Sequence, residues 1–122
     1  MTFLGLIDPS FLIVYDDNMN LKGKTTLVTG GGKRVGREIA LKLAQKGSNI
    51  LLHFNTSKTD AEKTAREIQA YGVQCLLFQA DLSNSASLST MVKEIYRQSL
   101  SVDILINSAS LFYKTPFKDV KE

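Results

Sequence analysis

The chain has 122 residues, of which 43% are hydrophobic, and it carries a formal net charge of +3 at pH 7. This length accommodates one domain, and the basic residues are scattered rather than clustered, which argues against nucleic acid as a partner. A single cysteine, Cys75, excludes an intrachain disulfide, and its apolar surroundings favour a buried thiol over a reactive one. We therefore expect a small globular domain with a cytoplasmic location and no metal site.

The first 20 residues contain an apolar segment that Asp8 and Pro9 interrupt. No basic region precedes this segment, and it is too short to cross a membrane, so neither a signal peptide nor a membrane partner is expected. A second methionine, Met19, directly precedes a polar lead into the next apolar run. We interpret residues 1–20 as an N-terminal extension, with Met19 as an alternative start, and residues 21–122 as the folded domain.

From residue 21 onward, apolar strand patterns alternate with amphipathic helix patterns. Strands are expected at 25–29, 49–54, 73–79 and 103–107, and helices at 34–46, 58–71 and 85–99. Gly47 and Gly72 terminate the first two helices, and Ser57 with Asp60 resembles a capping box before the second. The strands are nearly continuous apolar runs, as in a parallel sheet that is buried on both faces. The pattern predicts an α/β fold with a Rossmann-like doubly wound parallel sheet, truncated after about four strands and therefore open at one edge.

A glycine-rich turn from Thr29 to Gly36 separates the first strand from the first helix. Glycines permit tight turning and close approach of the backbone to a pyrophosphate, and the following helix N-terminus adds a partial positive charge. The spacing is not that of a Walker A loop, because no Gly-Lys-Ser/Thr follows a four-residue gap. The turn predicts a dinucleotide site, and the alternative is a loop that binds no ligand.

Two segments resemble the short-chain dehydrogenase/reductase family. The first is Thr-Gly-x-x-x-x-x-Gly after the first strand, in which Arg34 stands where the family usually has Gly or Ala. Arg34 preceded by Lys33 is similar to the pteridine reductase branch of that family. The second segment, residues 107–116, reads NSASLFYKTP and resembles that branch's Asn-Asn-Ala-Ser-x-Phe-Tyr-x-Thr-Pro. Asp81-Leu82 after the third strand also agrees with the family pattern.

The resemblance covers residues 21–122 and implies a nicotinamide cofactor. The expected cofactor-binding residues are Thr29, Gly30, Gly32, Lys33, Arg34, Val35, Gly36, His53, Asn55, Thr56, Ser57, Asp81, Leu82, Asn107, Ser108 and Ala109. His53 is placed beside the cofactor rather than in the chemistry. The second strand ends without the acidic residue that binds the ribose 2′-hydroxyl of NAD, so NADP(H) is expected. Hydroxyls of Thr56 and Ser57 and nearby cations can bind a 2′-phosphate, although the pteridine reductase pattern has Arg where this chain has Thr56.

Three further assignments follow from the resemblance. Asn107 corresponds to the asparagine of the family's catalytic network, and Ser110 and Phe112 lie on the substrate side, where Phe112 would stack on a pterin ring. Ser108 replaces the family's usual second Asn. Asp81 would accept a hydrogen bond from the adenine amino group. The alternatives are loop packing for Phe112 and a helix N-cap for Asp81.

Hydride transfer in the family uses a Ser, a Tyr and a Lys four residues after the Tyr. The residues four positions after Tyr15, Tyr71, Tyr96 and Tyr113 are Met19, Cys75, Leu100 and Phe117. We therefore expect the NADP(H)-binding half of a short-chain oxidoreductase that is inactive alone. The intact enzyme, expected as a homo-oligomer, would transfer hydride from NADPH to a pterin or a related C=N or C=O substrate. The alternatives are a non-catalytic nucleotide-binding module and a remnant of a truncated gene.

Overall fold

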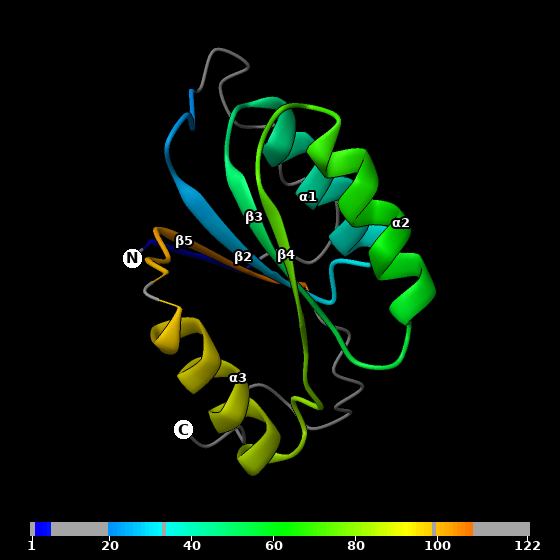
Figure 1. Cartoon of the computed structure of the whole chain (residues 1–122), viewed down its shortest axis with the longest axis vertical. Coiled ribbons are helices and arrows are strands. Elements are labelled where there is room, and N and C mark those ends of the chain that lie inside the picture. Colours follow the sequence, from blue (N-terminus) through cyan, green and yellow to red (C-terminus); the bar gives the residue numbers. More distant parts are fainter. Residues whose placement is uncertain (1, 6–19, 33, 99, 109–122) are drawn as a thin grey trace.

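The structure is a computed structural model that describes residues 2–5, 20–32, 34–98 and 100–108. The described residues form an α/β fold in which helices cover both faces of a five-stranded parallel sheet (Figure 1). In chain order the elements are β1 (Thr2–Gly5), β2 (Thr25–Thr29), α1 (Arg34–Gln45), β3 (Asn49–Phe54), α2 (Lys58–Gln69), β4 (Cys75–Gln79), α3 (Ser85–Arg97) and β5 (Ile104–Asn107). The Rossmann-like architecture expected from the sequence is confirmed.

The strands are ordered β1-β5-β2-β3-β4, and each neighbouring pair is parallel. Counted from β2, the order β4-β3-β2-β5 is the 3-2-1-4 order of a doubly wound sheet. The chain therefore reverses its direction of winding between β2 and β5. Ligands of such sheets bind beyond the carboxyl ends of the strands at this switch point.

The edge of the sheet beyond β5 differs from the expectation. Strand β1 pairs with β5 in a register that runs from Thr2 opposite Ile104 to Gly5 opposite Asn107. In the doubly wound order this position belongs to the strand that follows β5. The open edge expected at β5 is therefore wrong, because a segment from residues 1–20 pairs with it. The interpretation of residues 1–20 as an extension with an alternative start stays a prediction.

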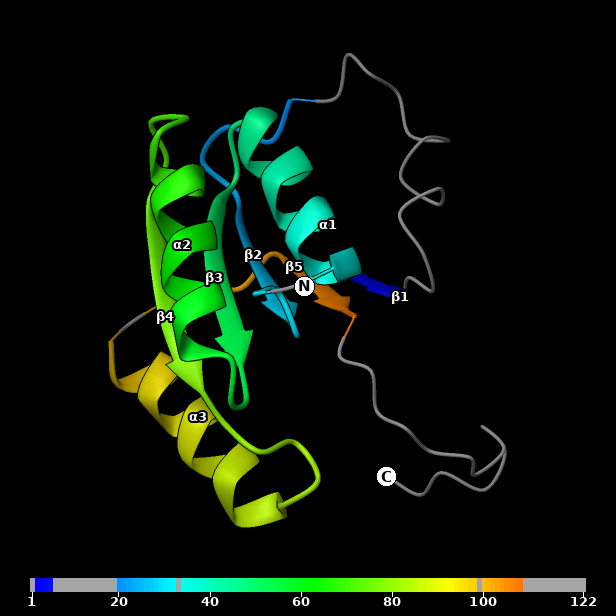
Figure 2. The same cartoon turned by 90° about the vertical axis from the view of Figure 1, so that its right-hand side faces the viewer.

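Two hydrophobic cores lie on opposite faces of the sheet. Figure 2 shows α1 and α2 in front of the sheet. Val28 and Leu52 pack in the core beneath α1 and α2, whereas their neighbours Leu27 and Leu51 pack in the core beneath α3. Because successive strand residues point to opposite faces, burial of both faces explains the continuous apolar runs. Cys75 lies in the first core, where burial raises the pKa of its thiol to about 12, so the expectation of a buried cysteine is confirmed.

The element boundaries agree with the sequence patterns to within two residues. The three helices end at residues 45, 69 and 97, and the last two predicted strands begin at 75 and 104. Gly47 and Gly72 have φ values of 99° and 87°, as expected for glycines that terminate helices. The capping box at α2 is wrong, because Ser57 occupies the N-cap position with φ −86° and ψ 60° and its side chain makes no capping hydrogen bond.

Candidate functional site

The glycine turn after β2 is closely packed at two positions, against backbone at Gly36 and against the end of a side chain at Gly31. A Cβ atom on Gly36 would lie 2.1 Å from the carbonyl oxygen of Gly30, and a Cβ atom on Gly31 would lie 2.3 Å from Cδ1 of Leu52. Gly30 itself has a φ of 64°. The turn therefore requires glycine so that its backbone can lie against β3 and the start of α1.

Helix α1 begins beside this turn with an unusual backbone conformation. Arg34 is exposed and has a φ of 52°, in the left-handed region that costs a non-glycine residue roughly 1–2 kcal/mol. Strain of this kind is concentrated at functional segments of proteins. The first turn of α1 contains no acidic residue, so the partial positive charge of the helix N-terminus is not neutralised by its own side chains. Val35, one residue further, is half-buried against the first core.

Side-chain hydrogen bonds join the ends of β2 and β5 at the switch point. Thr29 Oγ1 donates to Asn107 Oδ1 over 2.9 Å and accepts from the Ser108 N–H over 3.1 Å. The Ser108 hydroxyl in turn donates to the carbonyl oxygen of Thr29. Ser108 therefore ties the two strands together although it replaces the family's usual Asn, and the contact with Thr29 fixes the orientation of the Asn107 side chain.

His53, at the end of β3, is only 2% exposed and uses both ring nitrogens. Its Nδ1 accepts from the Gly30 N–H over 2.9 Å, and its Nε2 lies 2.8 Å from the carbonyl oxygen of Ala80. An amide N–H can only donate and a carbonyl can only accept, so both contacts require the neutral ring with its hydrogen on Nε2. Burial lowers the pKa of His53, and the hydrogen bond to Ala80 opposes this effect. The ring therefore contacts the backbone of the turn and of Ala80, the residue that follows β4.

Helix α2 provides a second contact to the turn. The Thr64 hydroxyl, buried at 1% exposure, donates to the carbonyl oxygen of Gly32 over 3.1 Å. The Gly31 N–H donates to the carbonyl oxygen of His53 over 3.0 Å. Thr64 is not among the residues selected from the sequence. Its signal is a hydroxyl on the otherwise apolar face of α2, but that signal does not reveal which segment the hydroxyl binds.

The segment between β3 and α2 is open to solvent and has no acidic side chain. Asn55 and Thr56 are exposed, Ser57 is half-buried, and Lys58 at the start of α2 is exposed. The carbonyl oxygen of Asn55 accepts from Gln79 Nε2 over 3.0 Å. Hydroxyl groups and a cation therefore lie together at this strand end, as the sequence indicated.

Asp81 follows β4 and folds back on its own turn. Its carboxylate accepts from the Ser83 hydroxyl over 2.6 Å and from the Ser83 N–H over 3.0 Å, and these bonds lower the pKa of Asp81. The N-cap of α3 is Asn84, whose side chain accepts from two N–H groups of the helix. The alternative of Asp81 as the N-cap is therefore wrong. Leu82 packs at the edge of the second core.

Four selected residues, Lys33, Ala109, Ser110 and Phe112, lie outside the described residues, and their roles stay predictions. Among the residues that the structure describes, no group of three His, Cys, Asp or Glu side chains could hold a metal ion. Within the same ranges, no helix has the length and apolar character needed to cross a membrane.

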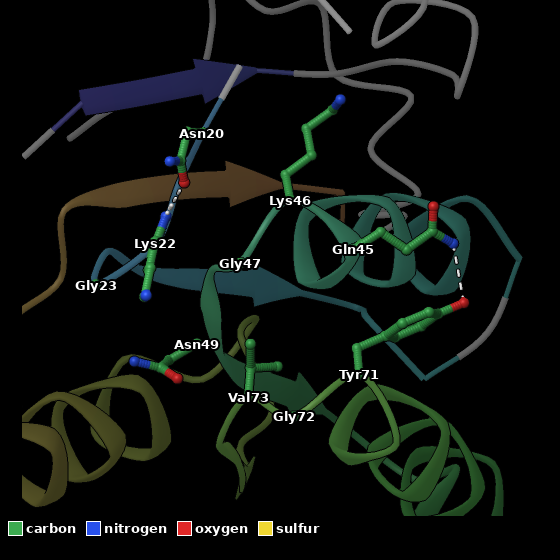
Figure 3. Close-up of a pocket in the computed structure, with 10 residues that line it drawn as sticks. All are labelled: Asn20, Lys22, Gly23, Gln45, Lys46, Gly47, Asn49, Tyr71, Gly72 and Val73. Carbon is green, nitrogen blue, oxygen red and sulfur yellow. Dashed lines mark hydrogen bonds between the residues drawn. The ribbon is translucent and has the colours of Figure 1, made fainter. Parts of the chain in front are cut away.

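A separate pocket of about 410 Å³ lies at the end of the sheet opposite the glycine turn (Figure 3). The segments before β2, β3 and β4 contribute most of its lining, so it lies at the amino ends of the strands. The Tyr71 hydroxyl, at its rim, accepts from Gln45 Nε2 over 2.9 Å. None of the residues selected for cofactor binding lines this pocket.

Comparison with known proteins identifies the family. Residues 24–122 match the family model described as short chain dehydrogenase. A short-chain dehydrogenase/reductase homolog, YusS of Bacillus subtilis, is 35% identical over 103 residues, which are 84% of this chain and 94% of that protein. The 3-oxoacyl-[acyl-carrier-protein] reductase FabG of Staphylococcus epidermidis is 40% identical over 88 residues, which are 72% of this chain but 36% of that protein. The chain thus spans nearly all of one relative and about a third of the other.

Solved structures agree. A putative dehydrogenase from Burkholderia cenocepacia with bound NADP matches with a TM-score of 0.71 and 30% identity, over 93% of this chain and 43% of that chain. An NAD+-bound xylitol dehydrogenase matches with a TM-score of 0.65 and 28% identity, over 70% of this chain and 32% of that chain. The same fold therefore accompanies either cofactor among these structures. This chain belongs to the short-chain dehydrogenase/reductase family of oxidoreductases and carries its NAD(P)-binding Rossmann fold.

Proposed function

We propose that this chain binds NADP(H) at the carboxyl ends of β2, β3, β4 and β5 and forms the cofactor-binding part of a short-chain reductase. The observation that carries this proposal is the glycine turn, in which the backbone of Gly30 excludes a side chain at Gly36 next to the N-terminus of α1. A glycine turn beside a helix N-terminus at a switch point favours a bound pyrophosphate.

The described residues fit a dinucleotide along this edge. The turn and the first residues of α1 would hold the pyrophosphate. Asp81 and Leu82 would contact the adenine, and Asn107 and Ser108 would lie towards the nicotinamide. The Thr29–Asn107–Ser108 hydrogen bonds support this assignment, because they fix polar groups at the place where β2 and β5 end together.

The preference for NADP(H) over NAD(H) rests on the strand end after β3. No carboxylate stands at residues 55–57, and the exposed side chains of Thr56 and Lys58 can provide a hydroxyl and a positive charge. A 2′-phosphate is stabilised by such groups, whereas the ribose hydroxyl of NAD is usually bound by an acid at this place. Arg34, exposed at the start of α1, provides a second cation near the turn.

In a complete reductase built on this part, bound NADPH supplies a hydride, and we propose a pterin or a related C=N or C=O compound as its acceptor. The pterin assignment rests on Arg34, Ser110 and Phe112, which match the pteridine reductase branch. Two of the proteins named above, a 3-oxoacyl-[acyl-carrier-protein] reductase and a xylitol dehydrogenase, have other substrates in their names, so a direct assay with a pterin tests this assignment. Because no tyrosine of this chain has a lysine four residues later, we expect the chain alone to bind cofactor without reducing a substrate.

A second candidate is a non-catalytic nucleotide-binding module. Two observations favour it. The match spans 94% of YusS, and β1 pairs with the edge of β5 that the next strand would occupy in a doubly wound sheet. The remnant alternative predicts that neither cofactor binds.

The test is a calorimetric titration of the purified chain with NADPH and with NADH. We expect NADPH to bind about tenfold more tightly or better, since one charge-assisted contact to the 2′-phosphate contributes on the order of 1.5 kcal/mol. Gly36→Val is the matched control, because a Cβ atom there would meet the Gly30 carbonyl oxygen at 2.1 Å and should abolish binding. Equal affinities would contradict the NADP preference, and no binding of either would contradict the cofactor-binding role.

NADPH oxidation with dihydrobiopterin tests the catalytic prediction in the same preparation. We expect no oxidation above the rate without protein. Turnover by the purified chain would overturn the assignment of the chain as a binding part and would require a proton donor other than the family's Tyr and Lys.

A further inference from the structure

The glycine turn after β2 is contacted by two buried side chains from other elements, His53 from β3 and Thr64 from α2. We propose that His53 and Thr64 are positioning residues that hold residues 30–32 in the conformation that receives the cofactor. This proposal rests on the proposed function only for the identity of the ligand, because the hydrogen bonds of His53 and Thr64 are made within the chain itself.

His53 connects three segments through one buried ring. Its Nδ1 accepts from the Gly30 N–H and its Nε2 donates to the Ala80 carbonyl oxygen, at 2.9 and 2.8 Å. The turn after β2 is thereby linked to the ends of β3 and β4. A buried ring with both nitrogens bonded cannot rotate without breaking a hydrogen bond. It therefore fixes the position of the Gly30 backbone relative to the ends of β3 and β4.

The same residue also determines which amides of the turn remain for a ligand. The Gly30 N–H donates to the His53 ring, and the Gly31 N–H donates to the His53 carbonyl oxygen. Each N–H group has one hydrogen to donate. An anion at this edge must therefore be bound by amides that follow Gly31, which brings the pyrophosphate towards the N-terminus of α1.

Thr64 fixes the last of the three glycines from the other side. Its hydroxyl donates to the Gly32 carbonyl oxygen over 3.1 Å, and a Cβ atom on Gly32 would lie 3.2 Å from the backbone of Ala61. Helix α2 thus lies directly against the turn. The carbonyl of Gly32 is held towards α2, and the same oxygen, turned the other way, would repel a phosphate placed at the carboxyl edge.

Two pairs of variants of the full chain separate positioning from packing. His53→Asn keeps an acceptor oxygen near the Nδ1 position for the Gly30 N–H, whereas His53→Gln places its amide near the Nε2 position and keeps only the Ala80 contact. Thr64→Ser keeps the hydroxyl, whereas Thr64→Val keeps the shape and removes it. Amide hydrogen exchange of the segment around residues 30–32 is measured beside NADPH affinity, and the amides of β3 at residues 50–52 serve as the internal reference for global unfolding.

We expect His53→Gln and Thr64→Val to accelerate exchange in the turn and to weaken NADPH binding, each about tenfold, which corresponds to the loss of one buried hydrogen bond. Thr64→Ser should stay within about twofold of the wild-type chain in both measurements, and His53→Asn, which keeps the contact to the turn but loses the contact to Ala80, should affect both measurements less than His53→Gln does. Equal behaviour within each pair would overturn the proposal, as would acceleration at residues 50–52 equal to that in the turn. If the wild-type chain binds neither NADPH nor NADH, the proposed function fails, and the exchange comparison alone decides the role of His53 and Thr64.

Discussion

Arg34 adopts a left-handed backbone conformation that glycine accommodates more easily than any other residue. Its φ of 52° would be without cost for glycine, one of the two residues, Gly or Ala, that the family usually has there. The left-handed conformation costs Arg roughly 1–2 kcal/mol, while glycine adds roughly 0.5–1 kcal/mol of unfolded-state entropy. A strained cation beside the proposed phosphate site is explained if its charge acts on the ligand.

Arg34→Gly should therefore raise the free energy of unfolding by less than about 1 kcal/mol and weaken binding of both cofactors, with a larger loss for NADPH than for NADH. Urea unfolding and paired titrations measure the two effects. A loss of stability above about 2 kcal/mol would indicate that the side chain is needed for packing instead.

Thr56 provides a test of cofactor choice at the end of β3. Thr56→Asp places a carboxylate where NAD-binding members of doubly wound folds have one. We expect NADPH affinity to fall about tenfold or more, because the new charge repels a 2′-phosphate, and NADH affinity to stay or rise. Gln74→Asp introduces the same charge at an exposed position before β4. It is the control and should change neither affinity. A drop in both affinities for Thr56→Asp alone would instead indicate local distortion.

The protonation of His53 should link stability to pH. Protonated His53 would place a second donor against the Gly30 N–H, and burial already lowers its pKa below 6.5. No charged side chain contributes to this shift: Arg34 is exposed, and the Asp81 carboxylate after β4 is bonded to Ser83. The unfolded chain therefore binds a proton more readily, and stability should be fully present above pH 6.5 and decrease as the pH falls below it.

Urea midpoints between pH 7.5 and 5.0 measure this slope, in a range above the titration of most carboxylates. His53→Asn should give a flatter profile over the same range because it has no ring to protonate. Parallel profiles for the two chains would mean that another group controls the dependence.

The sequence was sufficient to place most of the site because of one topological rule. Thr29, Asn107 and the residues after β3 and β4 all end parallel strands, so a parallel sheet brings them to one edge. It was insufficient for Thr64 and for the orientation of the His53 ring. Both depend on how α2 and β4 dock against the turn, which is a tertiary contact without a local pattern.

At the scale of elements, the predicted strands and helices form because their apolar periodicity and terminating glycines agree with the packed structure. Strand β1 is the exception. A strand of four residues has too short a pattern to be recognised, and its partner β5 lies about a hundred residues away in sequence. Its pairing nevertheless changes the molecule, because it converts an unpaired strand edge into a bonded one.

Removal of residues 1–18 should therefore expose the edge of β5. We expect faster amide exchange over residues 104–107 and concentration-dependent self-association of the shortened chain, as measured by exchange mass spectrometry and analytical ultracentrifugation. Exchange over residues 49–54, in a strand with partners on both sides, is the reference. Unchanged protection at β5 would mean that β1 contributes nothing to the edge in solution.

At the scale of the whole molecule, the two faces of the sheet are covered unequally. Among the described residues, helices α1 and α2 cover one face and α3 lies on the other (Figures 1 and 2). Helix α3 buries Met91 and Ile95, but Leu88, Val92 and Tyr96 remain 39%, 39% and 77% exposed. These three side chains follow a spacing of four residues and form an outer apolar stripe on α3. We expect this stripe to contact another copy of the chain, so that the chain self-associates through α3.

Two neighbouring residues of α3, Val92 on the exposed stripe and Met91 in the second core, can be substituted to compare the two sides of the helix. Val92→Lys changes the exposed stripe and should alter the free energy of unfolding by no more than about 0.5 kcal/mol while reducing self-association. Met91→Lys, one residue earlier but 5% exposed, places a charge in the second core and should cost about 3 kcal/mol or more. Thermal unfolding and sedimentation of both variants give the comparison. A similar loss of stability from both substitutions would show that the stripe is packed in solution. Self-association of Val92→Lys equal to that of the wild-type chain would show that the stripe is not the contact surface.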